Sequence, residues 1–159
     1  MVIRAKYVHT NLIARDWRTL ASFYERVFGC TPVPPERDLS GDALERGSRV
    51  PGAALRGVHL RLPGCGADGP TLEIFTYHVL AEGQSAAANR PGFGHVAFAV
   101  PDVATARAAV LAAGGSAYGD IVTTSAGSRT VTWTYVRDPE GNLVELQAWS
   151  SGEASASDQ

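Results

Sequence analysis

The chain has 159 residues, 45% of them hydrophobic, and a formal net charge of −2. This length allows one good core, shared between two small halves. The near-neutral charge and the lack of a Lys/Arg-rich run argue against a nucleic-acid partner, which leaves small molecules as the expected ligands. We expect no membrane span, because no apolar run is long enough to cross a bilayer, and no secretion leader, because no charged segment followed by an apolar one is present. The two cysteines have no metal-type spacing and favour a reducing cytoplasm.

The first elements of the chain are a short strand and an amphipathic helix. Val8 to Ala14 is mostly apolar, which predicts a strand. Asp16 is a suitable N-cap for a helix from Trp17 to about Phe28, and Gly29 is a suitable stop signal. Apolar residues recur at helical spacing in this segment, so one helical face is expected to pack on the core.

A less regular stretch follows the helix. Three prolines at 32, 34 and 35 and the run from Gly41 to Gly52 predict a long irregular connection, which could act as a lid over a site. Alternation then resumes around residues 58–62 and predicts a strand with His59 on the face opposite its apolar residues. Thr71 to Tyr77 is the next predicted strand.

The second half repeats this order after a polar linker around residues 83–90. A strand containing His95 precedes an alanine-rich helix that Asp102 caps. Two further strands, Thr130 to Val136 and Asn142 to Trp149, are predicted to form a hairpin. Residues 150–159 are small and polar, which predicts a disordered tail.

The two halves correspond residue by residue at several positions. Tyr7 to Gly29 and Phe93 to Gly115 each contain an aromatic residue, a histidine two positions later, an aspartate seven positions after the histidine, a helix and a glycine. Each half also ends on a strand with one acidic residue between apolar neighbours, Glu73 in the first and Glu145 in the second. The chain is therefore predicted to be a duplicated β-α-β-β-β module.

Four residues at corresponding places in the two halves form a candidate set of metal ligands. They are two histidines and two glutamates: His9, Glu73, His95 and Glu145. Imidazole and carboxylate ligands suit a divalent first-row metal. Strand parity allows all four side chains to face one concave surface. An unpaired carboxylate between apolar residues would be costly, and a metal removes that cost.

These motifs resemble those of the vicinal oxygen chelate superfamily, which includes glyoxalase I, methylmalonyl-CoA epimerase, extradiol dioxygenases and bleomycin resistance proteins. The resemblance rests on the contexts of His9, Glu73 and His95 and on the run from Asp138 to Leu146. It implies an α+β fold in which two tandem βαβββ modules form an open, cup-shaped mixed sheet. It also implies one domain at 1–149, made of modules 5–80 and 91–149, and a homodimer.

The ligand pattern most resembles that of bacterial-type glyoxalase I. This resemblance implies a divalent metal, which could be nickel, zinc, cobalt, manganese or iron, and a lyase or isomerase that abstracts a proton beside a metal-chelated carbonyl. Glu145 or Glu73 could serve as the base. An approximate alignment with the epimerase places His59 at a catalytic position. Three aromatic residues are candidates for substrate binding: Tyr77, Trp133 and Tyr135.

Two positions depart from glyoxalase I, and two other functions stay open. The resemblance places Ile13 and Tyr77 at the positions where glyoxalase I carries an arginine and an asparagine that bind glutathione. A reaction that does not depend on glutathione is therefore expected. The first alternative is a small-molecule binding or antibiotic resistance protein. The second is an iron-dependent extradiol dioxygenase. Glu73 disfavours this function, because the resemblance to those enzymes would place a histidine at its position.

Overall fold

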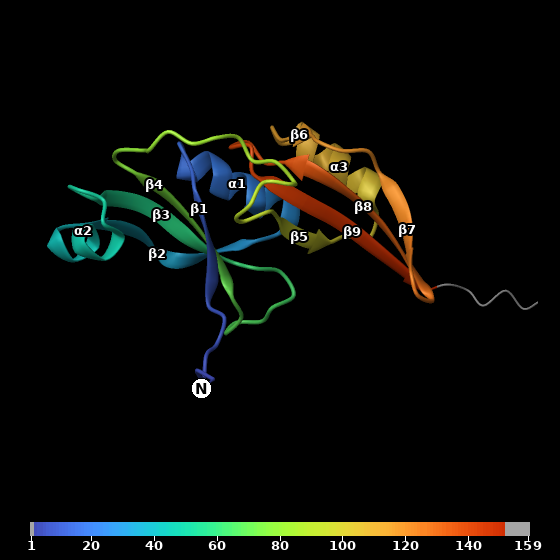
Figure 1. Ribbon diagram of the computed structural model, residues 1–159, viewed down its shortest axis with the longest axis horizontal. Coiled ribbons are helices and arrows are strands. Elements are labelled where there is room, and N and C mark those ends of the chain that lie inside the picture. Colours follow the sequence, from blue (N-terminus) through green and yellow to red (C-terminus); the bar gives the residue numbers. More distant parts are fainter. Residues whose placement is uncertain (1, 152–159) are drawn as a thin grey trace, which may run out of the picture. The chain divides into compact units, whose positions relative to one another are not determined.

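The computed structural model describes residues 2–151 and divides into two compact units between Gln84 and Ser85. Each unit contains its own open sheet, in which one parallel strand pair adjoins antiparallel pairs. The units appear with their element labels in Figure 1. The predicted fold class, α+β with two tandem βαβββ modules, is confirmed.

The first unit follows the predicted element order with one added helix. Its elements are β1 (His9–Ile13), α1 (Trp17–Phe28), β2 (Thr31–Ser40), α2 (Asp42–Ser48), β3 (Ala54–Arg61) and β4 (Thr71–Tyr77). The strands lie in the order β1-β4-β3-β2, with β1 parallel to β4 and the other pairs antiparallel. The strand β4 is therefore central and has a partner on each side.

The second unit has the corresponding arrangement. Its elements are β5 (Val96–Ala99), α3 (Val103–Ala112), β6 (Ser116–Ala117), β7 (Val122–Ala126), β8 (Arg129–Arg137) and β9 (Leu143–Ser151). The order is β5-β9-β8-β6, and β7 also pairs with β8. The strand β9, like β4, has a partner on each side. His95 directly precedes β5, so the prediction of a strand that contains His95 is wrong.

Helix α1 begins and ends at the predicted residues. Asp16 Oδ1 accepts hydrogen bonds from the backbone N–H groups of Arg18 and Thr19, at 3.0 and 3.3 Å. Gly29 has a φ of 70°, the left-handed conformation that a glycine adopts without strain, and its N–H donates to the carbonyl of Glu25. Both ends of the helix are thus satisfied by local hydrogen bonds.

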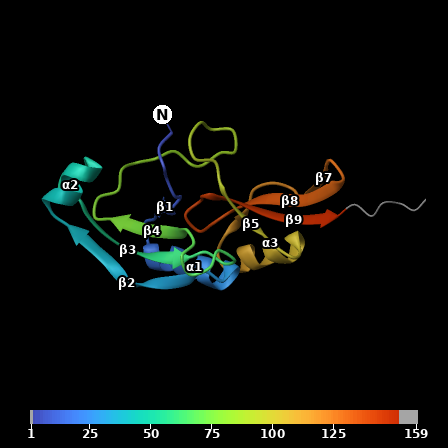
Figure 2. The ribbon, with the colours of Figure 1, turned by 90° about the horizontal axis from the view of Figure 1, so that it is seen from below.

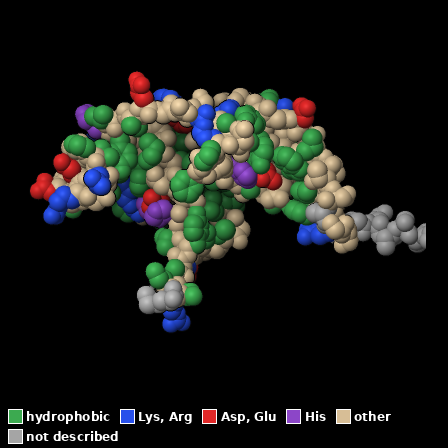
Figure 3. Space-filling model, viewed as in Figure 1, with side chains coloured by type: hydrophobic (Ala, Val, Ile, Leu, Met, Phe, Trp, Pro, Cys, Tyr) green, Lys and Arg blue, Asp and Glu red, His purple; other side chains and the backbone are tan. Residues whose placement is uncertain are grey.

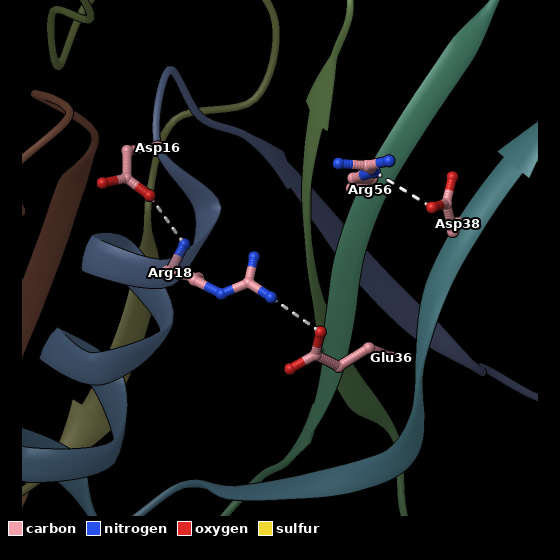
Figure 4. A network of polar contacts seen from close by, with 5 residues as sticks. All are labelled: Asp16, Arg18, Glu36, Asp38 and Arg56. Atoms are coloured by element: carbon pink, nitrogen blue, oxygen red, sulfur yellow. Dashed lines mark hydrogen bonds and ion pairs between the residues drawn. The ribbon is translucent and has the colours of Figure 1, made fainter.

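One face of α1 packs on the sheet of its unit. The buried helix residues include Leu20, Phe23 and Tyr24, and they pack on the side of β3 and β4 where Leu60 and Ile74 are also buried. Arg18, at the start of the helix, pairs with Glu36 of β2 at 2.9 Å, as Figure 4 shows. Both side chains of this pair are more than 60% exposed, so it stabilises the fold only slightly.

The segment predicted to be an irregular connection instead forms β2 and α2, so that prediction is wrong. The strand β2 is at the edge of its sheet and pairs only with β3. Its pairing breaks between Val33 and Arg37, where Pro34 and Pro35 lie, and the prolines therefore do not have to donate to a continuous ladder. Helix α2 has acidic residues in its first turn and a basic residue in its last, which favour a short helix.

The core of the second unit lies between α3 and the strands β8 and β9. Val103 and Val110 of the helix are buried, as are Val136, Val144 and Leu146 of the sheet. Figure 2 shows α3 beneath these strands. The predicted cap is present, because the Asp102 carboxylate accepts from the N–H of Thr105 at 2.7 Å.

A tight turn joins β8 to β9 and sets their register. The buried Asp138 carboxylate accepts hydrogen bonds from Glu140 N–H at 3.0 Å and from the backbone and side chain of Asn142, both at 2.9 Å. Gly141 takes a φ of 90°, and its N–H donates to the Asp138 carbonyl. With the turn held in this way, Tyr135 lies directly opposite Glu145.

Two further predictions concern the tail at residues 150–159 and the expected lack of a membrane span. The strand β9 includes residues 150 and 151, which were predicted to begin the tail, and residues 152–159 lie outside the described part. No helix in the described part is long and apolar enough to span a bilayer. Figure 3 shows hydrophobic side chains and charges of both signs on one face.

Replacing Asp138 with alanine should destabilise the second unit. The substitution removes a buried acceptor of three hydrogen bonds, so we expect a loss of about 2 kcal/mol of unfolding free energy. Urea unfolding followed by circular dichroism measures the loss. Asp120→Ala, at an exposed position of the same unit, is the matched control. Equal stabilities of the two variants would contradict the assigned role of the turn.

The stability of α1 should depend on the ionisation of Asp16. Hydrogen bonds from the Thr19 hydroxyl, and then from backbone N–H groups, lower the pKa of this carboxyl. Because the pKa is lower in the folded chain, the ionised group stabilises the fold above about pH 4, and this contribution disappears as the pH falls through the folded pKa. Thermal unfolding should show wild type to be more stable than Asp16→Asn near neutral pH, with a smaller difference near about pH 3. A difference that does not change with pH would disprove this.

Candidate functional site

Glu73 lies in the middle of the central strand of the first unit. Its register partners are Asn11 on β1 and His59 on β3, so polar side chains flank it on both sides. Its neighbours in sequence, Leu72 and Ile74, point to the opposite face and are buried in the core. Only 7% of the Glu73 surface is exposed, and a carboxylate this buried requires polar partners.

Three side chains supply those partners. His59 Nε2 lies 2.9 Å from Glu73 Oε1, and His9 Nδ1 lies 3.3 Å from the same oxygen. Asn11 Nδ2 donates to Glu73 Oε2 at 3.4 Å. The rings of His9 and His59 are edge to face, with centroids 6.3 Å apart. The first unit thus gathers two imidazoles and one amide around one carboxylate.

Burial and charge act in opposite directions on His59. Desolvation is the largest influence and lowers its pKa, whereas the negative charge of Glu73 raises it and the nearby Arg37 and His9 lower it further. The net effect is a pKa below the ordinary value. The His59 ring is therefore mainly neutral near neutral pH, when it can donate through one nitrogen and accept through the other.

Glu145 occupies the corresponding place in the second unit. It lies in the central strand β9, with Ala97 of β5 and Tyr135 of β8 as register partners. His95 Nε2 lies 2.9 Å from Glu145 Oε2. The side chains of this pair are 32% and 19% exposed, so the pair is partly open to solvent.

Aromatic rings adjoin the His95–Glu145 pair. The Tyr135 ring lies 4.9 Å from the His95 ring, and the Trp133 ring lies 5.3 Å from that of Tyr135, both between centroids. Burial, and secondarily the charge of Glu145, raise the pKa of Tyr135 above its usual value. Its phenol stays protonated at neutral pH and can donate a hydrogen bond.

The two units thus place different side chains around equivalent carboxylates. His9 and His95 correspond, as do Glu73 and Glu145. The neighbours across the sheet differ, because His59 in the first unit corresponds to Tyr135 in the second and Asn11 corresponds to Ala97. The first carboxylate therefore has polar surroundings, whereas the second has aromatic and small apolar ones.

The structure brings most of the predicted site residues into contact within their own unit. His59 touches Glu73, while Trp133 and Tyr135 lie in a row with His95. Tyr77 instead lines a cavity of about 460 Å³ together with residues of α1, β2 and β3. Sequence reasoning did not assign a role to Asn11, although its position two residues after His9 places it on the same strand face.

The two His–Glu pairs offer imidazole nitrogen and carboxylate oxygen atoms, the donor chemistry that divalent metals accept. Within residues 2–151, no group of three or more His, Cys, Asp or Glu side chains is arranged to hold a metal ion. Two atoms bound to one ion at about 2.1 Å are roughly 3.0–3.4 Å apart. The N···O distances of 3.3 Å for His9–Glu73 and 2.9 Å for His95–Glu145 are close to this range. Each pair therefore fits two ligands of a divalent ion.

Comparisons with known proteins agree with the fold. A family model described as glyoxalase/bleomycin resistance protein/dioxygenase superfamily matches residues 6–146. A search of curated proteins found no match. A solved glyoxalase family protein from Bacillus cereus is 18% identical, with a TM-score of 0.74 over 94% of this chain and 95% of its own.

Two other solved structures are similar at lower TM-scores. A family enzyme from Burkholderia phytofirmans PsJN is 17% identical with a TM-score of 0.59, over 91% of this chain and 98% of its own. A protein from the mobile metagenome of V. Pseudocholerae is 22% identical with a TM-score of 0.56, over 95% and 99%. At these identities the similarity supports the fold alone.

Replacing Glu73 with glutamine should lower the pKa of His59 further. The substitution removes the negative charge that raises this pKa and leaves the burial that lowers it. NMR titration of the histidine ring protons in chelator-treated protein measures the change. Glu36→Gln is the control, because that glutamate is exposed and pairs with Arg18. A His59 pKa that rises in Glu73→Gln would refute the contact.

Proposed function

Because the chain belongs to the glyoxalase/bleomycin resistance protein/dioxygenase superfamily, we propose that it is a divalent-metal-dependent lyase or isomerase. In this proposal it removes a proton from the carbon beside a carbonyl group of a small molecule. The observation that carries the proposal is the pair of His–Glu contacts at equivalent positions of the two units. A homodimer and a small-molecule substrate are part of the proposal.

The proposed ligands are His9 and Glu73 from the first unit and His95 and Glu145 from the second. Two imidazoles and two carboxylates suit nickel, zinc, cobalt, manganese or iron. When bound, such an ion would act as a Lewis acid that polarises the carbonyl and acidifies the adjacent C–H. Asn11 and His59 would orient the Glu73 carboxylate, because each contacts one of its oxygens.

Proton transfer is assigned to groups of this chain. Glu145 or Glu73 is the proposed base, which takes the proton on a carboxylate oxygen. His59 is proposed as a further proton-transfer group, because its Nε2 is within hydrogen-bond distance of Glu73 Oε1. Tyr135, opposite Glu145 and protonated at neutral pH, could donate to an oxygen of the substrate.

Glutathione is not part of the proposed reaction. By resemblance, Ile13 and Tyr77 occupy the positions of the glutathione-binding residues of glyoxalase I. Neither side chain carries a charge that could pair with the carboxylates of glutathione. A binding or resistance protein is the second candidate. The aromatic row of the second unit favours it, since Trp133 and Tyr135 could hold an apolar ligand without any chemistry.

Metal content is the first test of the proposal. Protein purified without chelator or affinity-tag metal should contain a near-stoichiometric divalent ion by mass spectrometry. His95→Ala and Glu145→Ala should each lose most of it, because each removes one proposed ligand. His78→Ala and Glu82→Ala, at exposed positions, are the matched controls and should retain it. Circular dichroism verifies that the variants fold.

The identity of the ion separates the candidates. Nickel, zinc, cobalt or manganese supports the lyase or isomerase. Iron together with substrate-dependent oxygen consumption would instead support a dioxygenase. Wild-type protein that holds no metal even after reconstitution would disprove the metalloenzyme and leave a binding protein.

Proton abstraction can be tested before the natural substrate is known. Metal-loaded protein in deuterium oxide should exchange the C–H protons of α-hydroxyketones or 2-oxoaldehydes faster than buffer, as followed by proton NMR. Glu145→Gln should slow this exchange if Glu145 is the base. His59→Ala with unchanged exchange would remove His59 from the mechanism.

A further inference from the structure

One face of the second unit presents a row of rings beside Glu145. His95, Tyr135 and Trp133 follow one another with centroid distances of 4.9 and 5.3 Å. Tyr135 and Trp133 are alternate residues of β8, so both point to the face that carries Glu145. Both are only partly buried, which leaves aromatic surface available to a ligand.

Two small side chains lie on β5, which β9 separates from β8. Ala97 of β5 is the register partner of Glu145, which in turn is opposite Tyr135. Ala99 is the partner of Gln147, which is opposite Trp133. Both alanines are exposed, and their methyl groups protrude little from the sheet. Glu145 and Gln147 therefore lie between the two alanines and the aromatic row, and the apolar surface next to Glu145 is that of the row itself.

The cations near this face are already engaged. Arg129 and Arg137 are the positively charged residues of β8, and β5 and β9 have none. Arg129 stacks on the Trp149 ring at 4.6 Å. Arg137 stacks on Tyr118 at 4.7 Å and donates to the carbonyls of Gly141 and Ala86. A phosphate or carboxylate group on the ligand would find no arginine of β8 available without breaking these contacts.

We propose that the substrate carries an uncharged aromatic ring that packs against Trp133 and Tyr135. The ring extends from the carbonyl group whose oxygen faces the His95–Glu145 pair. The inference rests on the proposed function for the orientation of the carbonyl, and on the second unit alone for the ring. It favours aryl ketones over glutathione adducts and coenzyme A thioesters, which carry several negative charges.

Two matched ketones test the inference. Hydroxyacetone and 2-hydroxy-1-phenylethanone share the α-hydroxyketone group and differ in a methyl against a phenyl substituent. Zinc-reconstituted protein should bind the phenyl compound at least about tenfold more tightly by calorimetry. Trp133→Leu should weaken phenyl-ketone binding about five- to tenfold and change hydroxyacetone binding little.

Trp149→Leu is the matched control. It removes an indole from the same sheet face, and Arg129 already covers the Trp149 ring. This variant should keep the wild-type preference for the phenyl compound. Equal affinities of wild type for the two ketones would overturn the inference. So would equal losses in Trp133→Leu and Trp149→Leu.

The same titrations in chelator-treated protein separate this inference from the proposed function. Suppose that removing the metal leaves the affinity for each ketone unchanged, while the phenyl preference still depends on Trp133. The ring site then stands and the metalloenzyme proposal fails. If metal strengthens the binding of both ketones but wild type shows no phenyl preference, the metalloenzyme proposal stands and the ring site is wrong.

Discussion

The position of each glutamate in a central strand is the constraint on which the rest of the structure depends. A residue in the middle of a sheet has neighbours on two sides, so Glu73 and Glu145 are each set between two strands. A shift of one residue in register would move either carboxylate into the core, where Leu72 and Leu146 now pack. The Asp138 turn matters to the site for this reason, because it determines which residue lies opposite Glu145.

A carboxylate at such a position needs compensation for lost hydration, and the two units provide it differently. The more buried Glu73 contacts His9, His59 and Asn11. Glu145 is more exposed, and it contacts His95. These contacts give each carboxylate at least one polar partner. They also hold nitrogen and oxygen donors close together, which would reduce the rearrangement that metal binding requires.

The difference between the units suggests a division of roles within the proposed enzyme. The surroundings of Glu73 are rich in groups that hold and move protons, whereas those of Glu145 offer rings and methyl groups. Duplicated modules can retain the same fold while their register positions diverge in this way, because His59 and Tyr135 both point away from the core and need not fit its packing.

The sequence by itself determined the elements whose signals are local. Asp16 and Gly29 delimit α1, Asp102 begins α3, and alternation marks β3, because caps and strand parity act over a few residues. The internal repeat also predicted that His9 and Glu73 occupy the same places in the first half as His95 and Glu145 in the second. Only the tertiary structure decided that the proline-rich segment is an edge strand, that Asn11 supports Glu73, and that Tyr135 adjoins His95. Those outcomes depend on which strands become neighbours, and residues far apart in the chain make that choice together.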